Sequence, residues 1–170
     1  MKIRHPPDRI TIRPLTDDAE AEFCAALMEH SEPWLSLGTG HRALLDLMRN
    51  AARERYVASL DSRIAGFVVI NMSGPLAGYI QTICVAPEDR SAGIGRELMA
   101  HAEARIFRET ANVFLMVSDF NTAARGFYER LGYRAIAEIP EFLIAGRAEI
   151  LMRKTRGPIR GYAGQSAING

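Results

Sequence analysis

The sequence predicts a mixed domain of the α/β or α+β class, in which helices pack on a sheet. The elements expected from its hydrophobic pattern follow in the order strand, two helices, three strands, helix, strand, helix, two strands. This order combines antiparallel hairpins with a strand–loop–helix unit that is typical of parallel pairing. The length of 170 residues suits one compact domain that buries a sizeable core.

Local signals bound the first elements. A capping box at Asp17 and Glu20 starts the first helix, and Pro33 breaks it because proline disfavours helical backbone in the residue before it. Residues 61–63, Asp-Ser-Arg, are typical of a hairpin turn. The expected elements are a strand over 9–13, a helix from 17 to the break at 31–34, a second helix around 44–48, and strands over 56–60 and 64–70.

The second half is organised around one amphipathic helix. Ile94, Leu98, Ala102 and Ile106 recur every four residues and form a single apolar stripe. The other expected elements are strands over 79–85 and 113–117, a short helix over 122–131, and strands over 134–139 and 148–153. The glycine-rich segment beyond residue 154 has no apolar periodicity, and we expect an extended or poorly ordered C-terminal extension over 155–170.

Composition narrows the class of protein. The formal net charge is +1 and no long basic tract occurs, which argues against a nucleic-acid partner. No apolar run approaches the length of a membrane span and no signal-peptide core is evident, so we expect a cytoplasmic protein without a membrane partner. The spacing of Cys24 and Cys84 suits neither a disulfide framework nor a metal site, so we expect buried free thiols and no metal.

The most informative segment is residues 90–96, Arg-Ser-Ala-Gly-Ile-Gly-Arg, which joins the strand over 79–85 to the amphipathic helix. Glycines at the start of a helix let backbone N–H groups approach a ligand without an obstructing Cβ. The unpaired N–H groups of the first turn and the helix dipole then favour an anion. The sequence therefore predicts a phosphate or pyrophosphate site from Ser91 to Arg96.

The spacing decides between phosphate-binding motifs. A P-loop needs a lysine after its second glycine, and Arg96 follows Gly95 here. The dinucleotide fingerprint Gly-x-Gly-x-x-Gly is also absent. Arg90, Gly93 and Gly95, entered through residues 85–87 (Val-Ala-Pro), closely resemble motif A of the GNAT superfamily of acetyl-CoA-dependent N-acetyltransferases.

Residues 117–133 resemble motif B of the same superfamily, in which a strand ends in asparagine and a short helix carries Tyr-Glu-x-x-Gly-Phe/Tyr. Asn121 can cap that helix, and Gly132 is typical of the left-handed residue at its end. The resemblance covers residues 8–154 and is strongest over 79–133. It implies the GNAT fold, a central mixed, mostly antiparallel sheet flanked by helices.

The resemblance also implies acetyl-CoA as co-substrate and direct attack of a primary amine on its thioester through a tetrahedral intermediate. It implies main-chain contacts to acetyl-CoA from Ile83, Cys84 and Val85. The other cofactor-binding positions that it implies are Arg90, Ser91, Ala92, Gly93, Ile94, Gly95, Arg96, Asn121 and Tyr128. Tyr128 is implied as the general acid that protonates the departing thiolate. A partly buried structural tyrosine is the alternative reading of the same residue.

The general base is where the resemblance fails. Several members of the family place a glutamate five residues before the asparagine of motif B, and Met116 occupies that position here. Glu32, in a Ser-Glu-Pro-Trp loop between the first two helices, is our candidate for the base. The alternative is a solvated loop glutamate beside Trp34 as a core anchor. His30, at the end of the first helix, is open to the same two readings.

The acceptor implied by the resemblance is an amine-bearing small molecule or peptide. The near-neutral charge provides no field that would steer a polycation or a strongly acidic substrate. Two non-enzymatic readings stay open: an acyl-CoA sensor of the same fold without turnover, and an interaction domain without a ligand. A homodimer is left open as well.

Overall fold

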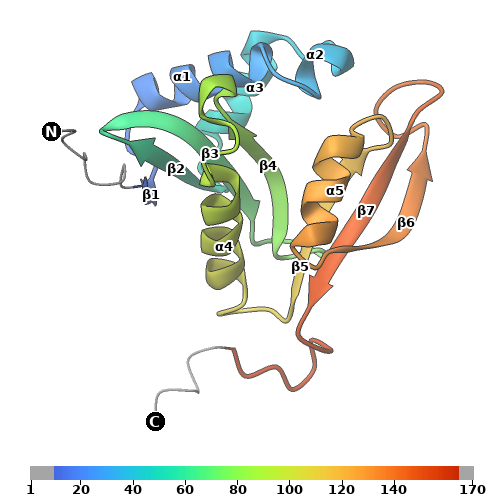
Figure 1. Cartoon of the computed structure of the whole chain (residues 1–170). Helices are drawn as coiled ribbons and strands as arrows, with labels where there is room; N and C mark the ends of the chain where they lie inside the picture. The colour runs from blue at the N-terminus through green and yellow to red at the C-terminus, as the bar shows by residue number, and fades with distance from the viewer. Residues whose placement is uncertain (1–9, 165–170) are drawn as a thin grey trace, which may run out of the picture.

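A computed structural model describes residues 10–164 of the chain. Residue 9 of the expected first strand, the expected domain start at residue 8 and the last six residues of the expected extension lie outside this range. The elements are β1 (Ile10–Pro14), α1 (Asp18–Glu29), α2 (Trp34–Leu37), α3 (His41–Arg49), β2 (Glu54–Leu60), β3 (Arg63–Asn71), β4 (Tyr79–Val85), the 3₁₀ turn η1 (Pro87–Asp89), α4 (Ile94–Ile106), β5 (Asn112–Ser118), α5 (Thr122–Arg130), β6 (Arg134–Pro140) and β7 (Ala148–Thr155) (Figure 1).

The strands form one sheet in the order β1-β2-β3-β4-β5-β7-β6. Every neighbouring pair is antiparallel except β4 and β5, which run parallel. The chain reaches β5 from β4 through α4, as a parallel pair requires a crossover connection. The mixed, mostly antiparallel sheet with flanking helices that the sequence predicts is confirmed.

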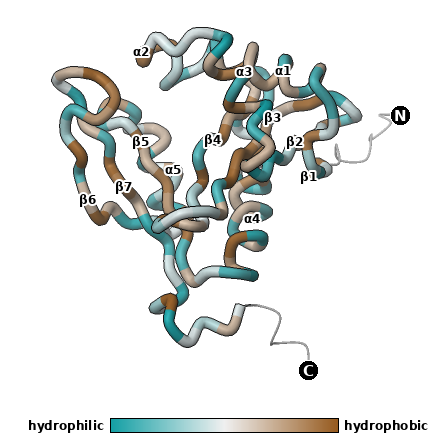
Figure 2. The backbone as a smooth tube through the Cα atoms, turned by 180° about the vertical axis from the view of Figure 1, so that it is seen from behind, coloured by the Kyte–Doolittle hydropathy of each residue, from teal (hydrophilic) through white to brown (hydrophobic). Residues whose placement is uncertain are grey.

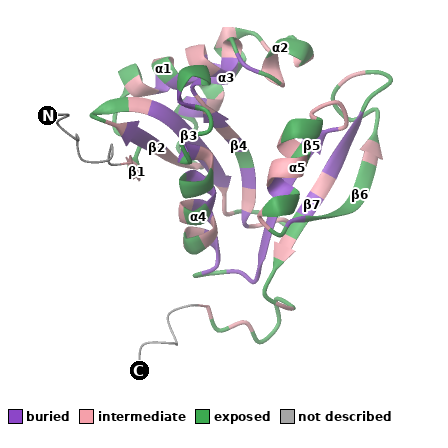
Figure 3. Ribbon diagram, viewed as in Figure 1, coloured by how far each residue is buried: buried purple, intermediate pink, exposed green. Residues whose placement is uncertain are grey.

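Helices cover both faces of the sheet. The larger core lies under α4 and α5 and includes Leu98, Ile106 and Val113, while α1 and α3 close a second core around Met28 and Phe67. Burial follows these two layers, and the edge strand β6 stays almost wholly exposed (Figure 3). Cys24 and Cys84 are free and buried in the second core, as predicted.

Gly66 on β3 lets α4 pack close to the sheet. A Cβ at this position would lie 2.7 Å from the carbonyl oxygen of Cys84 and 3.2 Å from Cδ1 of Leu98. The contact with Cys84 is with backbone, which cannot move aside as a side-chain end can. The close approach fixes the height of α4 above β3 and β4, and with it the position of the α4 N-terminus.

The cap, the turn and the helix break predicted in the first half of the chain are confirmed, and the structure adds one short helix. Asp17 caps α1 by accepting a hydrogen bond from the N–H of Glu20, and residues 61–62 form a left-handed turn between β2 and β3. The break at Pro33 is also present, but it is followed directly by the four-residue helix α2, which the sequence analysis treated as loop. Four residues are too few for a hydrophobic period to be read.

The segment after β7 lies against the far end of α4. The hydroxyl of Tyr162 donates to the carbonyl oxygen of Phe107 at 2.6 Å, and the guanidinium of Arg156 lies 4.1 Å from the centre of the Phe107 ring. The described part of the expected extension follows bends and turns and is packed on the domain. It lies at the opposite end of the sheet from α2 and the β6–β7 loop (Figure 1).

Candidate active site

The sheet opens between its two parallel strands. β4 and β5 pair only through Tyr79 with Phe114 and Ile80 with Leu115, although β4 continues to Val85 and β5 to Ser118. Beyond Ile80 the two strands diverge (Figure 1), so the side of β4 that faces β5 has no strand partner among residues 10–164. Ile83, Cys84 and Val85 lie on this stretch. An extended ligand with amide groups can pair with such a free edge.

The α4 N-terminus lies directly beyond this free edge. Ser91 and Gly93 have positive φ values of 70° and 87°, and the first turn of α4 has no side-chain cap. In the described part of the chain nothing lies within 4 Å of a Cβ placed on Gly93, so the surface there is open. Alternating backbone conformations of this kind turn successive N–H groups toward one point and form an anion site.

The predicted phosphate-site residues present different groups to that surface. Arg90, Ser91, Ala92, Gly93 and Arg96 are exposed, whereas the side chain of Ile94 is buried in the core and only its backbone is available to a ligand. Gly95 is half-buried beside Phe127.

The turn before the predicted phosphate site is held by an ion pair. Arg63 donates to both carboxylate oxygens of Asp89, at 2.6 and 2.8 Å. These bonds keep the pKa of Asp89 below its ordinary value, since they favour the charged form. η1 is thereby tied to β3, and the loop that leads into α4 starts from a fixed point.

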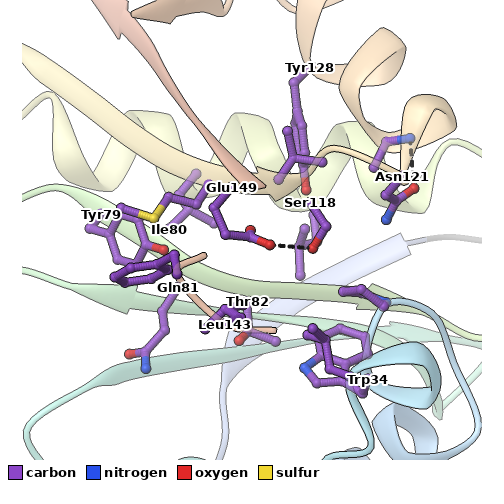
Figure 4. A pocket seen from close by; sticks show the side chains of 17 residues that line it. Trp34, Tyr79, Ile80, Gln81, Thr82, Ser118, Asn121, Tyr128, Leu143 and Glu149 are labelled. Carbon is purple, nitrogen blue, oxygen red and sulfur yellow. Dashed lines mark hydrogen bonds between the residues drawn. The ribbon is translucent and has the colours of Figure 1, made fainter. Parts of the chain in front are cut away.

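A cavity of about 200 Å³ lies in the opening between β4 and β5. It brings together residues from β4, β5, α5, β7, the α2 segment and the β6–β7 loop. The residues that line it are Pro33, Trp34, Leu37, Tyr79, Ile80, Gln81, Thr82, Ile83, Met116, Val117, Ser118, Asn121, Ala124, Tyr128, Phe142, Leu143 and Glu149 (Figure 4).

Tyr128 reaches this cavity from α5. Its residue is 9% exposed, and Figure 4 shows its side chain pointing from the helix toward Ser118 and Glu149. Burial, and secondarily the neighbouring Tyr79 and Cys84, raise the pKa of the Tyr128 hydroxyl well above its ordinary value. The hydroxyl is therefore protonated at neutral pH, the form that a proton donor needs.

Glu149 is the carboxylate that the sequence analysis missed. It is 5% exposed on β7, directly opposite Ser118 on β5, and its Oε1 accepts a hydrogen bond from the Ser118 hydroxyl at 2.6 Å. Desolvation raises the pKa of Glu149, Ser118 opposes the rise, and Asp119 adds to it. A buried carboxylate with a raised pKa in a cavity is a group suited to proton transfer.

One signal in the sequence pointed to Glu149. It is the single charged residue in the run 148–152, Ala-Glu-Ile-Leu-Met, which otherwise reads as a buried strand. A charge in such a run is rarely fully buried unless it has a partner or a role. Its neighbour in the cavity, Tyr79, has a pKa raised to about 12, chiefly by burial and then by the charge of Glu149.

Glu32 does not line the cavity. Its Oε2 accepts a hydrogen bond from the N–H of Ser36 at 3.2 Å, so its carboxylate is engaged at the start of α2. The neighbouring Trp34 does line the cavity and also packs against the second core. Met116, at the position where the resemblance expects a base, lies in the cavity wall.

Asn121 joins the cavity to α5. Its Oδ1 accepts a hydrogen bond from the N–H of Ala124 at 3.2 Å, which caps the helix as predicted. Capping uses the side-chain oxygen and leaves the carboxamide N–H groups as donors at the cavity wall. Ile83 and Tyr128 also line the cavity, whereas Cys84, Val85 and residues 90–96 lie outside it, along the free edge of β4 and at the α4 N-terminus.

Within residues 10–164, no three His, Cys, Asp or Glu side chains are grouped so that they could hold a metal ion. None of the helices in this range has the length and apolar character needed to cross a membrane.

The sequence matches a family of known proteins. The model of the acetyltransferase (GNAT) family matches residues 17–133. An uncharacterised N-acetyltransferase of Methanocaldococcus jannaschii is 35% identical over 109 residues, which are 62% of this chain and 69% of that protein. A blasticidin-S acetyltransferase of Streptomyces morookaense is 36% identical over 78 residues, 42% of this chain and 57% of that protein.

Solved structures agree on the fold. An aminoglycoside 6′-N-acetyltransferase complexed with coenzyme A superposes with a TM-score of 0.69 at 18% identity, covering 87% of this chain and 98% of that one. At this identity the likeness speaks for the fold alone. The match of the family model spans more than half of the sequence, and the chain belongs to the acetyltransferase (GNAT) family.

Proposed function

We propose that this protein transfers the acetyl group of acetyl-CoA to a primary amine. One observation carries the proposal: a single cavity holds a buried carboxylate, Glu149, and a protonated buried hydroxyl, Tyr128, at the point where the free edge of β4 meets the cavity. Acyl transfer to an amine needs one group that accepts a proton and one that donates it.

The free edge and the α4 N-terminus fit acetyl-CoA. The pantetheine arm carries amide groups that can pair with the backbone of Ile83, Cys84 and Val85. The open surface at Gly93 leaves room for a pyrophosphate, and the first-turn N–H groups of α4 favour its charge. Arg90 and Arg96 add positive charge on the exposed surface beside it. Asn121, which lines the cavity at the start of α5, can donate a carboxamide N–H to the arm.

Glu149 is the proposed base in place of Glu32. An amine must lose its proton before it can attack, and a carboxylate in the cavity wall can accept that proton directly or through a water. The hydroxyl of Ser118 holds the carboxylate in one orientation through the 2.6 Å hydrogen bond. Tyr128 donates its hydroxyl proton to the sulfur that leaves with coenzyme A. The backbone along the free edge of β4 offers N–H groups that can stabilise developing oxyanion charge.

The test pairs a binding experiment with a turnover experiment. Calorimetric titration of coenzyme A is expected to give saturable binding, and acetyl-CoA with a panel of primary amines is expected to release free thiol and form N-acetylated product. Binding without thiol release from any amine would contradict the enzyme and favour an acyl-CoA sensor. Absence of coenzyme A binding would contradict both and leave an interaction domain.

A further inference from the structure

The cavity wall carries a single ionisable carboxylate. Glu149 is the only Asp, Glu, Lys or Arg among the 17 residues that line the cavity. The carboxylate of the neighbouring Asp119 lies outside the cavity lining: its Oδ2 accepts from the N–H of Ala148 at 3.2 Å, and its Oδ1, which has no hydrogen-bond partner among the described residues, lies 3.7 Å from Arg147. The cavity therefore offers a counter-charge for one ammonium group, next to the residue proposed to take its proton.

A positive charge lies outside the cavity, at the exposed side of β4. The Nε of Arg53 donates to Oε1 of Gln81 at 2.8 Å, and Gln81 lines the cavity whereas Arg53 does not. Figure 4 shows the Gln81 carboxamide pointing away from Glu149 and Ser118. Like charges near a protein surface repel, so a second cation on a ligand that extends past Gln81 meets repulsion there.

The outer part of the cavity is apolar and has two walls. Trp34 and Leu37 come from the α2 segment, and Phe142 and Leu143 come from the β6–β7 loop, where they are 52% and 53% exposed. Figures 1 and 2 show α2 and this loop on opposite sides of the open end of the sheet. An apolar ligand body between the walls would remove this surface from water, which stabilises the complex.

The loop wall is held in place by its own hydrogen bonds. Oε1 of Glu141 accepts from the N–H of Gly146 at 2.9 Å, and the N–H of Glu141 donates to the carbonyl oxygen of Arg147 at 2.8 Å. These bonds close the loop on itself and present Phe142 and Leu143 without further ordering. A preformed wall binds an apolar group with less loss of conformational freedom.

From these contacts we propose that the acceptor is a small primary amine with one positive charge and a compact apolar or aromatic body. Its ammonium group lies against Glu149, and its body lies between the Trp34 and Leu143 walls. Polyamines and aminoglycosides, with several cations, are poor acceptors. This inference rests on the proposed acetyl transfer, since it names the substrate class of that site.

Trp34 provides a binding assay that does not depend on turnover. It is the only tryptophan in the chain, and it lines the cavity. We expect 2-phenylethylamine, added to the protein saturated with coenzyme A, to change Trp34 fluorescence with saturation, and spermidine and kanamycin to bind at least roughly tenfold more weakly. The values of kcat/KM with acetyl-CoA should follow the same order.

Three variants locate the selectivity. Phe142→Ala should raise KM for 2-phenylethylamine roughly tenfold with kcat little changed, since it removes uniform binding. Ile136→Ala is the matched control, because Ile136 is 47% exposed on β6 and does not line the cavity. Leu143→Glu adds a second carboxylate on the exposed loop and should shift the preference roughly tenfold toward spermidine.

The outcomes of these experiments distinguish the proposed acceptor class from the proposed acetyl transfer. Preference for spermidine, kanamycin or a peptide amino terminus in the wild type, or equal effects of Phe142→Ala and Ile136→Ala, would overturn the acceptor class while acetyl transfer stands. Saturable binding of 2-phenylethylamine without turnover of any amine would support the ligand class and contradict acetyl transfer. Failure of every amine to bind or react, with coenzyme A binding intact, would overturn both.

Discussion

At the scale of single residues, Glu149 carries a stability cost that the proposed function explains. Its pKa is raised in the folded protein, so the fold binds its proton more tightly than the unfolded chain does. The stabilisation that this tighter proton binding gives is present below the pKa of Glu149 in the unfolded chain. It is lost as the pH rises through the pKa of Glu149 in the folded protein. Above the folded pKa the charged side chain is buried at 5% exposure and opposes folding.

Glu149→Gln removes that charge and keeps an oxygen that can accept the Ser118 hydrogen bond. We therefore expect the variant at pH 8 to be at least as stable as the wild type, with turnover lowered roughly a hundredfold or more. Urea unfolding and thiol release measure the two effects. A variant less stable than the wild type by more than about 1 kcal/mol would instead give Glu149 a structural role.

Tyr128→Phe separates the acid from the packing residue. The ring stays beside Phe127 and Tyr133, and only the hydroxyl is removed. A donor used in the transition state lowers kcat and kcat/KM together, so we expect turnover reduced at least about tenfold. Coenzyme A affinity and the thermal midpoint should match the wild type. Unchanged turnover would leave Tyr128 as a core residue alone.

At the scale of elements, the α4 N-terminus is the proposed phosphate-binding part of the site. Gly93→Asp places a carboxylate where the pyrophosphate is expected and should abolish coenzyme A binding in calorimetric titration. Gly74→Asp is the matched control: φ is 81° at Gly74 and 87° at Gly93, and both have no atom within 4 Å of an added Cβ. The added charge is therefore the same at two positions with similar φ. Equal loss of binding in both variants would contradict the phosphate site.

The contact between β3 and α4 makes a second prediction at this scale. Gly66→Ala forces a Cβ against the carbonyl oxygen of Cys84 and should cost about 1–3 kcal/mol of folding free energy. Gly126→Ala, inside α5, meets only the end of the Arg130 side chain at 3.4 Å and should stabilise by about 0.5–1 kcal/mol. Thermal unfolding of the two variants shows whether each substitution lowers or raises the stability of the protein. A neutral Gly66→Ala would show that α4 is free to shift.

Helices could be predicted from the sequence where a hydrophobic periodicity or an N-terminal capping residue was present. The stripe from Ile94 to Ile106 predicted α4, and Asp17 predicted the start of α1. The helix α2 was missed because four residues carry neither signal. Its position matters, since it brings Trp34 into the cavity and engages Glu32, the predicted base, at its own first turn.

At the scale of the whole molecule, the candidate site depends on strand order more than on motifs. Tyr128, Asn121 and Ile83 were predicted because each lies within a local motif, and all three line the cavity. Glu149 has no motif. It reaches Ser118 because β7 inserts between β5 and β6 and pairs with β5 in one register. A shift of that register by one residue would turn Glu149 to the other face of the sheet.

The pH dependence of kcat/KM tests the central claim most directly, because it asks whether Glu149 takes the proton of the amine. With the wild type, kcat/KM should level off above the pKa of Glu149. With Glu149→Gln, only the neutral amine can react, so kcat/KM should keep rising about tenfold per pH unit toward the pKa of the amine, about 10.4 for a lysine-like group. The ratio of kcat/KM of the wild type to kcat/KM of Glu149→Gln should therefore fall as the pH rises. Parallel profiles across this range would contradict the account.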